Sequence, residues 1–358
     1  MSIRFLTPVE GECLCNRAGI ITTEGITVKV TLQASADHVT VNGITAAKAG
    51  NTFTASVLLV KGENTLTATA DSGERAAVSV WYLPNATGRF RISLDDNIRF
   101  LADIAAHKDT YQSVFEAPYL ALLRRLHEEY GAKFHANLFY ATDDGSFTLA
   151  DMPDTFREEW RANADWLRFS FHARTEHPDR PYLTDDGTRL ARDLAEVKRE
   201  ILRFAGEECY AKCDTTLHFG ACTRDGAIAL HRAGVRHVAG FFNPDANGNA
   251  GSVSYHLTGE KLPAIAKNGI WYDTDSALFC AKIDVVLNTG PIHDLRGKLD
   301  AAWEKSPVRG CFEALMHEQY FYEDYYHYLP DFEARLRVAL DFAREHALKP
   351  AFLSELTE

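Results

Sequence analysis

The first 86 residues alternate between apolar and polar positions with a period of two, the pattern of half-buried β-strands. The alternation is clearest over Ile26–Leu32. Further strand-like segments lie at 39–41, 53–60, 65–69 and 77–82. The dipeptide Asn42-Gly43 is a turn signal between two of them. Short strands with a turn about every 8–12 residues are typical of a β-sandwich. The sequence therefore predicts an all-β domain over residues 1–86, followed by a linker at 84–88.

From residue 87 to 358 the pattern changes to strands that alternate with helices. The predicted strands are Arg89–Leu94, Lys133–Tyr140, Trp166–Phe171, Thr215–Phe219, Val235–Phe241, Ala281–Leu287, Cys311–Met316 and Pro350–Leu353. The predicted helices are Tyr119–Tyr130, Thr188–Phe204, Asp225–Gly234 and Pro330–His346. Repeated strand–helix units predict a parallel sheet, and seven or eight of them fit a distorted (β/α)7-8 barrel. A doubly wound open sheet is the alternative fold.

Acidic and imidazole side chains follow several of these strands. In chain order they are Asp95 and Asp96, His172 with Glu176 and His177, His218, and His317. Because the carboxyl ends of barrel strands meet at one face, we expect these side chains to lie close together. Adjacent strand residues point to opposite sides, so Asp95 and Asp96 are expected to have different tasks. Aspartate, histidine and glutamate ligands suit a divalent metal, most of all zinc.

The segment Ser93-Leu94-Asp95-Asp96-Asn97 resembles the Thr-Phe-Asp-Asp-Gly motif of the NodB-type polysaccharide deacetylases, carbohydrate esterase family 4. The resemblance extends over most of residues 89–320. It implies that Asp95 is a general base and that Asp96 binds the metal. It also implies that His172 is a metal ligand, as the first histidine of the second motif, His-[Ser/Thr]-x-x-His. Glu176 stands at the second histidine's position and His177 follows it, so either residue is a candidate ligand.

Two further motifs of that family are matched less evenly. The motif arginine that orients the base is absent from Leu217–Gly220, where His218 is assigned instead to substrate binding. Ala314–His317 fits the last motif, which implies that His317 is the general acid. Tyr320 and Tyr322, in the aromatic run that follows, are predicted to bind sugar rings, with packing over the barrel mouth as the alternative.

Together these features predict a metal-dependent hydrolase that removes acyl groups from a carbohydrate. The alternatives are an inert barrel that binds glycan and a barrel glycoside hydrolase, which requires two suitably separated carboxylates. The N-terminal domain supports a carbohydrate function, because its Val39–Gly43 and Gly62–Ala70 segments resemble the immunoglobulin-like modules of bacterial carbohydrate-active enzymes. The expected partner is therefore a carbohydrate, and the sequence leaves the oligomeric state open.

The composition bears on the class of partner and on the cellular location. A net charge of −12 argues against nucleic acid as a partner. The chain shows neither a secretory leader pattern nor an apolar stretch of the roughly 18–20 residues that a membrane span needs. The seven scattered cysteines suit a reducing compartment, so a cytoplasmic location is expected, with export after removal of a leader as the alternative. A thiolate zinc site at Cys209, Cys213 and Cys222 is the weaker reading, and buried free thiols the stronger one.

Overall fold

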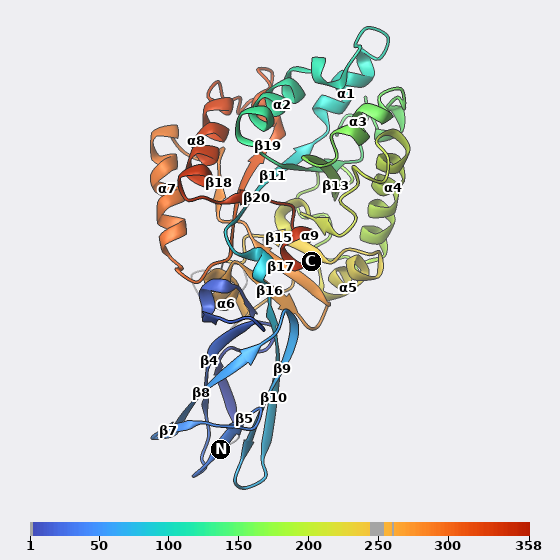
Figure 1. The fold of residues 1–358 in the computed structure, drawn as a ribbon. Helices are drawn as coiled ribbons and strands as arrows, with labels where there is room; N and C mark the ends of the chain where they lie inside the picture. Colours follow the sequence, from blue (N-terminus) through green and yellow to red (C-terminus); the bar gives the residue numbers. More distant parts are fainter. Residues whose placement is uncertain (1–2, 244–253, 260) are drawn as a thin grey trace.

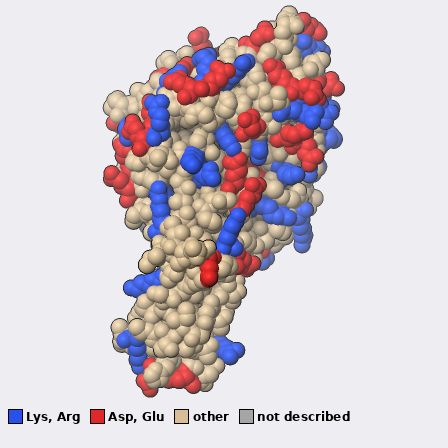
Figure 2. All heavy atoms as spheres, viewed as in Figure 1, with Lys and Arg blue, Asp and Glu red and all other residues tan. Residues whose placement is uncertain are grey.

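The computed structural model describes residues 3–243, 254–259 and 261–358 (Figure 1). A slender β-structured part, formed by the N-terminal residues, extends from a larger part in which helices surround β-sheets. Charged side chains of both signs are interspersed over the visible face of the larger part, whereas the β-structured part is mostly uncharged in the same view (Figure 2). None of the helices in the described ranges is long and apolar enough to cross a membrane.

The N-terminal part consists of two five-stranded sheets. One has the order β1-β4-β8-β7, with β3 paired to β4. The other has the order β2-β10-β9-β5-β6. The strands are β1 Arg4–Thr7, β2 Cys13–Leu14, β3 Ile20–Ile21, β4 Ile26–Gln33, β5 Val39–Val41, β6 Ile44–Thr45, β7 Ala47–Ala49, β8 Thr52–Leu59, β9 Gly62–Ala70 and β10 Arg75–Tyr82. Alternate residues of β4 and β8 are buried in a common core. The apolar positions of the two-residue sequence pattern are the ones that face this core.

The larger part contains a six-stranded and a four-stranded sheet. The first has the order β13-β12-β11-β19-β18, with β20 paired to β11, and the second has the order β14-β15-β17-β16. The strands are β11 Arg89–Asn97, β12 Phe134–Phe139, β13 Leu167–Ala173, β14 Asp214–Thr215, β15 His237–Gly240, β16 Ile270–Asp273, β17 Leu278–Lys282, β18 Val285–Val286, β19 Cys311–His317 and β20 Lys349–Pro350. All pairs are parallel except β16 with β17.

The described strands do not hydrogen-bond into one closed ring, so the predicted barrel is divided. The predicted strand 215–219 stops at Thr215, because His218–Gly220 forms a 3-10 turn in which Phe219 has a φ of 59°. The predicted strand 281–287 is split between β17 and β18. The mixed α/β sheets are confirmed, and closure of the barrel is not.

Helices pack on the outside of these sheets, with α7 and α8 on one side in Figure 1 and α4 and α5 on the other. The helices are α1 Arg99–Ala106, α2 Pro118–Tyr130, α3 Arg157–Ala162, α4 Thr188–Phe204, α5 Arg224–Arg232, α6 Lys261–Asn268, α7 Ile292–Glu304, α8 Phe332–Glu345 and α9 Ser354–Thr357. The four predicted helices are confirmed to within about two residues, and α2 ends at left-handed Gly131 as its sequence indicates.

The N-terminal part is joined to the four-stranded sheet by polar and apolar contacts. The Tyr272 amide donates to the Gly11 carbonyl at 2.9 Å, and Glu12 accepts from Lys267 and Asn268. Glu12 is 2% exposed, whereas the side chain of Lys267 is 48% exposed, so this ion pair lies at the edge of the contact. These contacts attach the N-terminal part to one side of the larger part.

Candidate metal and catalytic site

Strand β11 delivers two carboxylates to one cavity because its end is irregular. Its pairing with β12 shifts register between Leu94 and Asn97, and Asp96 has a φ of 59°. A regular strand would point Asp95 and Asp96 to opposite sides, but here both line the same cavity. Aspartate tolerates the left-handed region better than most residues, so the strained position suits its occupant. On the other side of β11, Asp95 is paired in register with His317 of β19.

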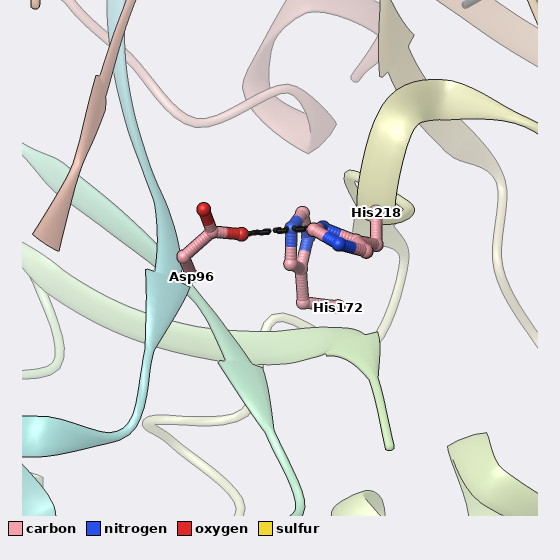
Figure 3. Close-up of side chains that lie close together, drawn as sticks. All are labelled: Asp96, His172 and His218. Atoms are coloured by element: carbon pink, nitrogen blue, oxygen red, sulfur yellow. Dashed lines mark hydrogen bonds and ion pairs between the residues drawn. The ribbon is translucent and has the colours of Figure 1, made fainter. Parts of the chain in front are cut away.

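Three side chains from separate segments converge at this strand end (Figure 3). Asp96 comes from β11, His172 from β13 and His218 from the 3-10 turn after β14. Asp96 Oδ1 lies 3.0 Å from His172 Nε2 and 3.2 Å from His218 Nδ1. The two ring nitrogens lie 3.1 Å apart. All three residues are buried, and this trio is one of two groups in the described residues with metal-ligand spacing.

The hydrogen bonds behind the two imidazoles decide which nitrogens face inward. His172 Nδ1 donates to the Thr216 carbonyl, and His218 Nε2 donates to the Glu176 carbonyl at 2.9 Å. In the neutral rings, His172 Nε2 and His218 Nδ1 are therefore both acceptors, and they face each other and a carboxylate oxygen. Three converging acceptors are stabilised by a positive charge, from a metal ion between them or from a proton on one ring. Ligands about 2.05 Å from a tetrahedral zinc lie about 3.3 Å apart, close to the spacing observed here. The donor set therefore fits zinc.

The charges in the cluster reinforce one another. Burial by itself raises the pKa of Asp96, but His317, His172 and His218 outweigh it and hold that pKa well below its usual value. Burial lowers the pKa of His172, and the carboxylates of Asp95 and Asp96 reverse that effect and raise it. When no metal is bound, a proton on His172 can supply the positive charge that the three acceptors need.

Asp95 and His317 are each held at one atom and free at the other. Asp95 Oδ1 accepts from Ser93 Oγ at 2.9 Å and from Asn137 Nδ2 at 2.7 Å. Asp95 Oδ2 has no hydrogen-bond partner in the described part of the chain. His317 Nδ1 is 2.9 Å from Asn288 Oδ1, while Nε2 faces Asp96 Oδ2 at 3.9 Å. One carboxylate oxygen and one ring nitrogen are thus available beside the metal-ligand cluster.

The second motif is arranged differently from its sequence expectation. His177 is exposed and pairs with Asp143 instead of joining His172. Glu176 lies closer, but Gln319 separates it from Asp96, donating to Asp96 Oδ2 at 2.8 Å and lying 3.4 Å from Glu176 Oε1. In the structure His218 is the third member of the buried group with Asp96 and His172, whereas Glu176 and His177 form the second group with metal-ligand spacing, together with Asp143. The sequence could not show this, because Glu176 and His177 line the same cavity from the loop after β13, where no periodic pattern indicates the direction of a side chain.

The cavity above the cluster has a volume of about 600 Å³. Its lining includes Tyr320 and Tyr326, and Tyr326 is 79% exposed. Tyr322 does not line it: the hydroxyl of Tyr322 donates to Glu318, and its ring lies under the Arg99 guanidinium. Tyr320 therefore meets the geometric requirement for its predicted role, Tyr322 serves packing, and Tyr326 is a further aromatic side chain at the mouth.

Glu318 ties the end of β19 to the first turn of α1. Its carboxylate accepts from the amides of Ile98, Arg99 and Phe100 at 2.6, 3.0 and 2.6 Å. These are amides at the start of a helix, which have no partner within it. Since Asp95 and Asp96 lie just before that helix and His317 just before Glu318, this one side chain fixes both segments relative to each other.

Sequence reasoning missed several polar residues of the site, among them Asn137, Asn288 and Gln319. Asn137 lies two residues after His135 on β12, so the two-residue strand period could have placed it on the same face. Asn288 lies in a turn and Gln319 in the short 3-10 helix Glu318–Phe321, where no periodic pattern indicates the direction of a side chain. The cysteines predicted as free thiols are free, including Cys209, Cys213 and Cys222.

Comparisons with known proteins give only distant likenesses. No protein-family profile and no curated protein sequence matches the chain. A proposed polysaccharide deacetylase of O-antigen biosynthesis from Bordetella bronchiseptica is 13% identical, with 75% of this chain and 88% of that chain covered and a TM-score of 0.33. A second, from Mycobacterium smegmatis, is 12% identical, with 75% and 90% covered and a TM-score of 0.40.

The 4-alpha-glucanotransferase from Thermococcus litoralis is 11% identical, with a TM-score of 0.45. The match covers 75% of this chain but 40% of the glucanotransferase, so it spans less than half of that protein. These scores are too low for an activity to be transferred, and the function has to be argued from the site itself.

Proposed function

We propose that the chain is a metal-dependent hydrolase that removes acyl groups from a carbohydrate, with zinc as the metal. The observation that carries the proposal is the placement of Asp95 and His317 beside the Asp96–His172–His218 cluster in one cavity. Its ligand atoms have the spacing of a tetrahedral site, and each flanking side chain offers one free polar atom. Metal, base and acid are the three components that metal-assisted acyl hydrolysis needs.

When bound, the metal polarises the acyl carbonyl and makes an attacking water more acidic. Asp95 takes a proton from that water through Oδ2, the oxygen left free by Ser93 and Asn137. His317 gives a proton from Nε2 to the leaving oxygen or nitrogen, while Asn288 holds its other nitrogen. Tyr320 and Tyr326 present ring faces and hydroxyls to a sugar at the cavity mouth.

The test is acetate release from acetylated xylan and from N-acetylchitohexaose by zinc-loaded protein. Asp95→Ala and His317→Ala should each lower turnover by about 10²–10⁴-fold, the usual contribution of a positioned acid or base. His293→Ala is the matched control, because His293 is an exposed histidine on α7. A chelator should abolish the activity and added zinc restore it. Full turnover by Asp95→Ala would refute the assignment.

The same experiment separates the alternative functions. Metal-free protein that binds the glycans and releases no acetate would indicate an inert binding protein. New reducing ends without acetate would indicate a glycoside hydrolase, which acts through paired carboxylates.

A further inference from the structure

We propose that Asn137, Ser170, His135 and Arg91 form a one-way chain of hydrogen bonds that positions the Asp95 carboxylate for proton transfer. The inference rests on the proposed function, because it takes Asp95 as the base. It concerns residues to which neither the motifs nor the cavity assigns a role. All four are buried, and they lie behind Asp95, away from the cavity lining.

The first link fixes the rotation of Asp95. Asn137 Nδ2 donates to Asp95 Oδ1 at 2.7 Å, and Ser93 Oγ donates to the same oxygen at 2.9 Å. The amide of Asn137 cannot be flipped, because its Oδ1 accepts from the backbone amide of Thr216 at 3.1 Å. Two donors on one carboxylate oxygen leave the other as the acceptor that can receive a proton.

The next links all point in the same direction. Ser170 Oγ donates to Asn137 Oδ1 at 2.6 Å, and His135 Nε2 lies 2.8 Å from Ser170 Oγ. Arg91 Nη2 lies 2.7 Å from His135 Nδ1. A guanidinium can only donate, so His135 Nδ1 must accept, and the proton of the neutral ring then sits on Nε2 and is donated to Ser170. From Arg91 to Asp95, every hydrogen bond therefore donates toward the carboxylate.

The arginine end supplies a fixed positive charge. Arg91 also pairs with Glu313 on β19, which holds the guanidinium in place at the far end of the chain. Burial, and then the charge of Arg91, keep the pKa of His135 well below its usual value, so the ring stays neutral. Hydrogen bonds aligned in one direction polarise one another, and here the polarisation strengthens the donors that hold Asp95 Oδ1.

A purely structural network would stabilise the fold without affecting turnover, so the two roles can be separated. In the positioning role, breaking the chain at Ser170 or His135 lets the carboxylate rotate, and turnover falls although neither side chain hydrogen-bonds to a proposed metal ligand or lines the cavity. Partners one step behind a functional side chain typically matter by about 10–100-fold. The KM for a small ester should stay within about two-fold, since none of the four residues contacts the cavity.

The experiment measures kcat and KM for 4-nitrophenyl acetate on the zinc-loaded full chain. Asn137→Ala should lower kcat by about 10²-fold and His135→Leu by about 10-fold, and the zinc stoichiometry of His135→Leu should be unchanged. His135→Gln should recover most of the loss, because a glutamine offers one acceptor to Arg91 and one donor to Ser170. The control is Tyr182→Phe, which removes a buried hydrogen bond to Asp193. Its kcat should not change.

Each outcome decides between the two proposals. If Asp95→Ala keeps its kcat, the proposed function fails and the chain has no base to position. If Asp95→Ala is inactive but His135→Leu and Ser170→Ala keep full kcat, the chain of hydrogen bonds is refuted and the hydrolase stands. A kcat for His135→Gln as low as that for His135→Leu would overturn the one-way polarity. If His135→Leu does not fold, Ser170→Ala decides, because it removes only a hydroxyl.

Discussion

Replacing His218 or His177 by alanine distinguishes the proposed metal site at Asp96, His172 and His218 from the one that the sequence motif implies. In the structure, His218 Nδ1 lies 3.2 Å from Asp96 Oδ1, whereas His177 pairs with Asp143 on the exposed side. We expect His218→Ala to weaken zinc binding strongly and His177→Ala to leave it nearly unchanged. Both variants remove one imidazole, so each is the control for the other.

The size of the effect follows from the ligand count. Structural zinc sites with four protein ligands bind with about 10–16 kcal/mol, or about 3 kcal/mol for each ligand. Losing one ligand of the Asp96–His172–His218 cluster should therefore raise the dissociation constant by about 10²–10³-fold. His177→Ala should change it by less than about three-fold, because the side chain of His177 is 68% exposed and lies outside the cluster.

The assay is competition for zinc between metal-free protein and a chromogenic chelator at pH 7.5, with circular dichroism to show that each variant is folded. Equal zinc affinity in His218→Ala and the unaltered protein would refute the cluster as a metal site. A larger loss of zinc affinity in His177→Ala than in His218→Ala would support the ligand set that the sequence motif implies. Glu176→Gln would then be the next variant to titrate with zinc.

Three further predictions concern stability. Glu318→Ala leaves three amides at the start of α1 without their acceptor, which should lower the free energy of unfolding in urea by about 3–5 kcal/mol and lower turnover as well. An unchanged urea midpoint would contradict the stabilising role of Glu318. Gly11→Ala places a Cβ 2.1 Å from the Tyr272 carbonyl oxygen at a φ of 78°, so limited proteolysis should cut between the two parts faster, and equal rates would contradict this. Burial raises the pKa of Asp273, but His256, Lys261 and Ser276 outweigh it and hold the pKa below its usual value of about 3.9. The folded chain then binds fewer protons than the unfolded chain, so this stability is present above about pH 4 and is lost as the pH falls through the folded-state pKa. Asp273→Asn should flatten the acid limb of thermal unfolding, and an unaltered slope would count against the pairing.

Local patterns in the sequence were enough to predict much of the secondary structure. The period of two indicated β4 and β8, and the period of 3.6 indicated α4 with both of its ends. Helices α1, α3, α6, α7 and α9 were not predicted; α1 begins at a carboxylate 220 residues away in sequence, Glu318, rather than at a capping residue of its own. Closure of the predicted barrel is not confirmed, because the described strands form two sheets, and the 3-10 turn at His218–Gly220 shortens one of the predicted strands.

The candidate site was likewise predictable from the sequence only in part. The sequence by itself determined that acidic and imidazole residues follow the strands, since strand direction and residue type are local properties. Only the tertiary structure decided that His218, and not Glu176 or His177, meets Asp96 and His172. The physical reason is that a ligand position depends on loop direction and side-chain rotation. Those are set by hydrogen bonds to distant backbone, such as Thr216 to His172 and Glu176 to His218, which no spacing within one segment encodes.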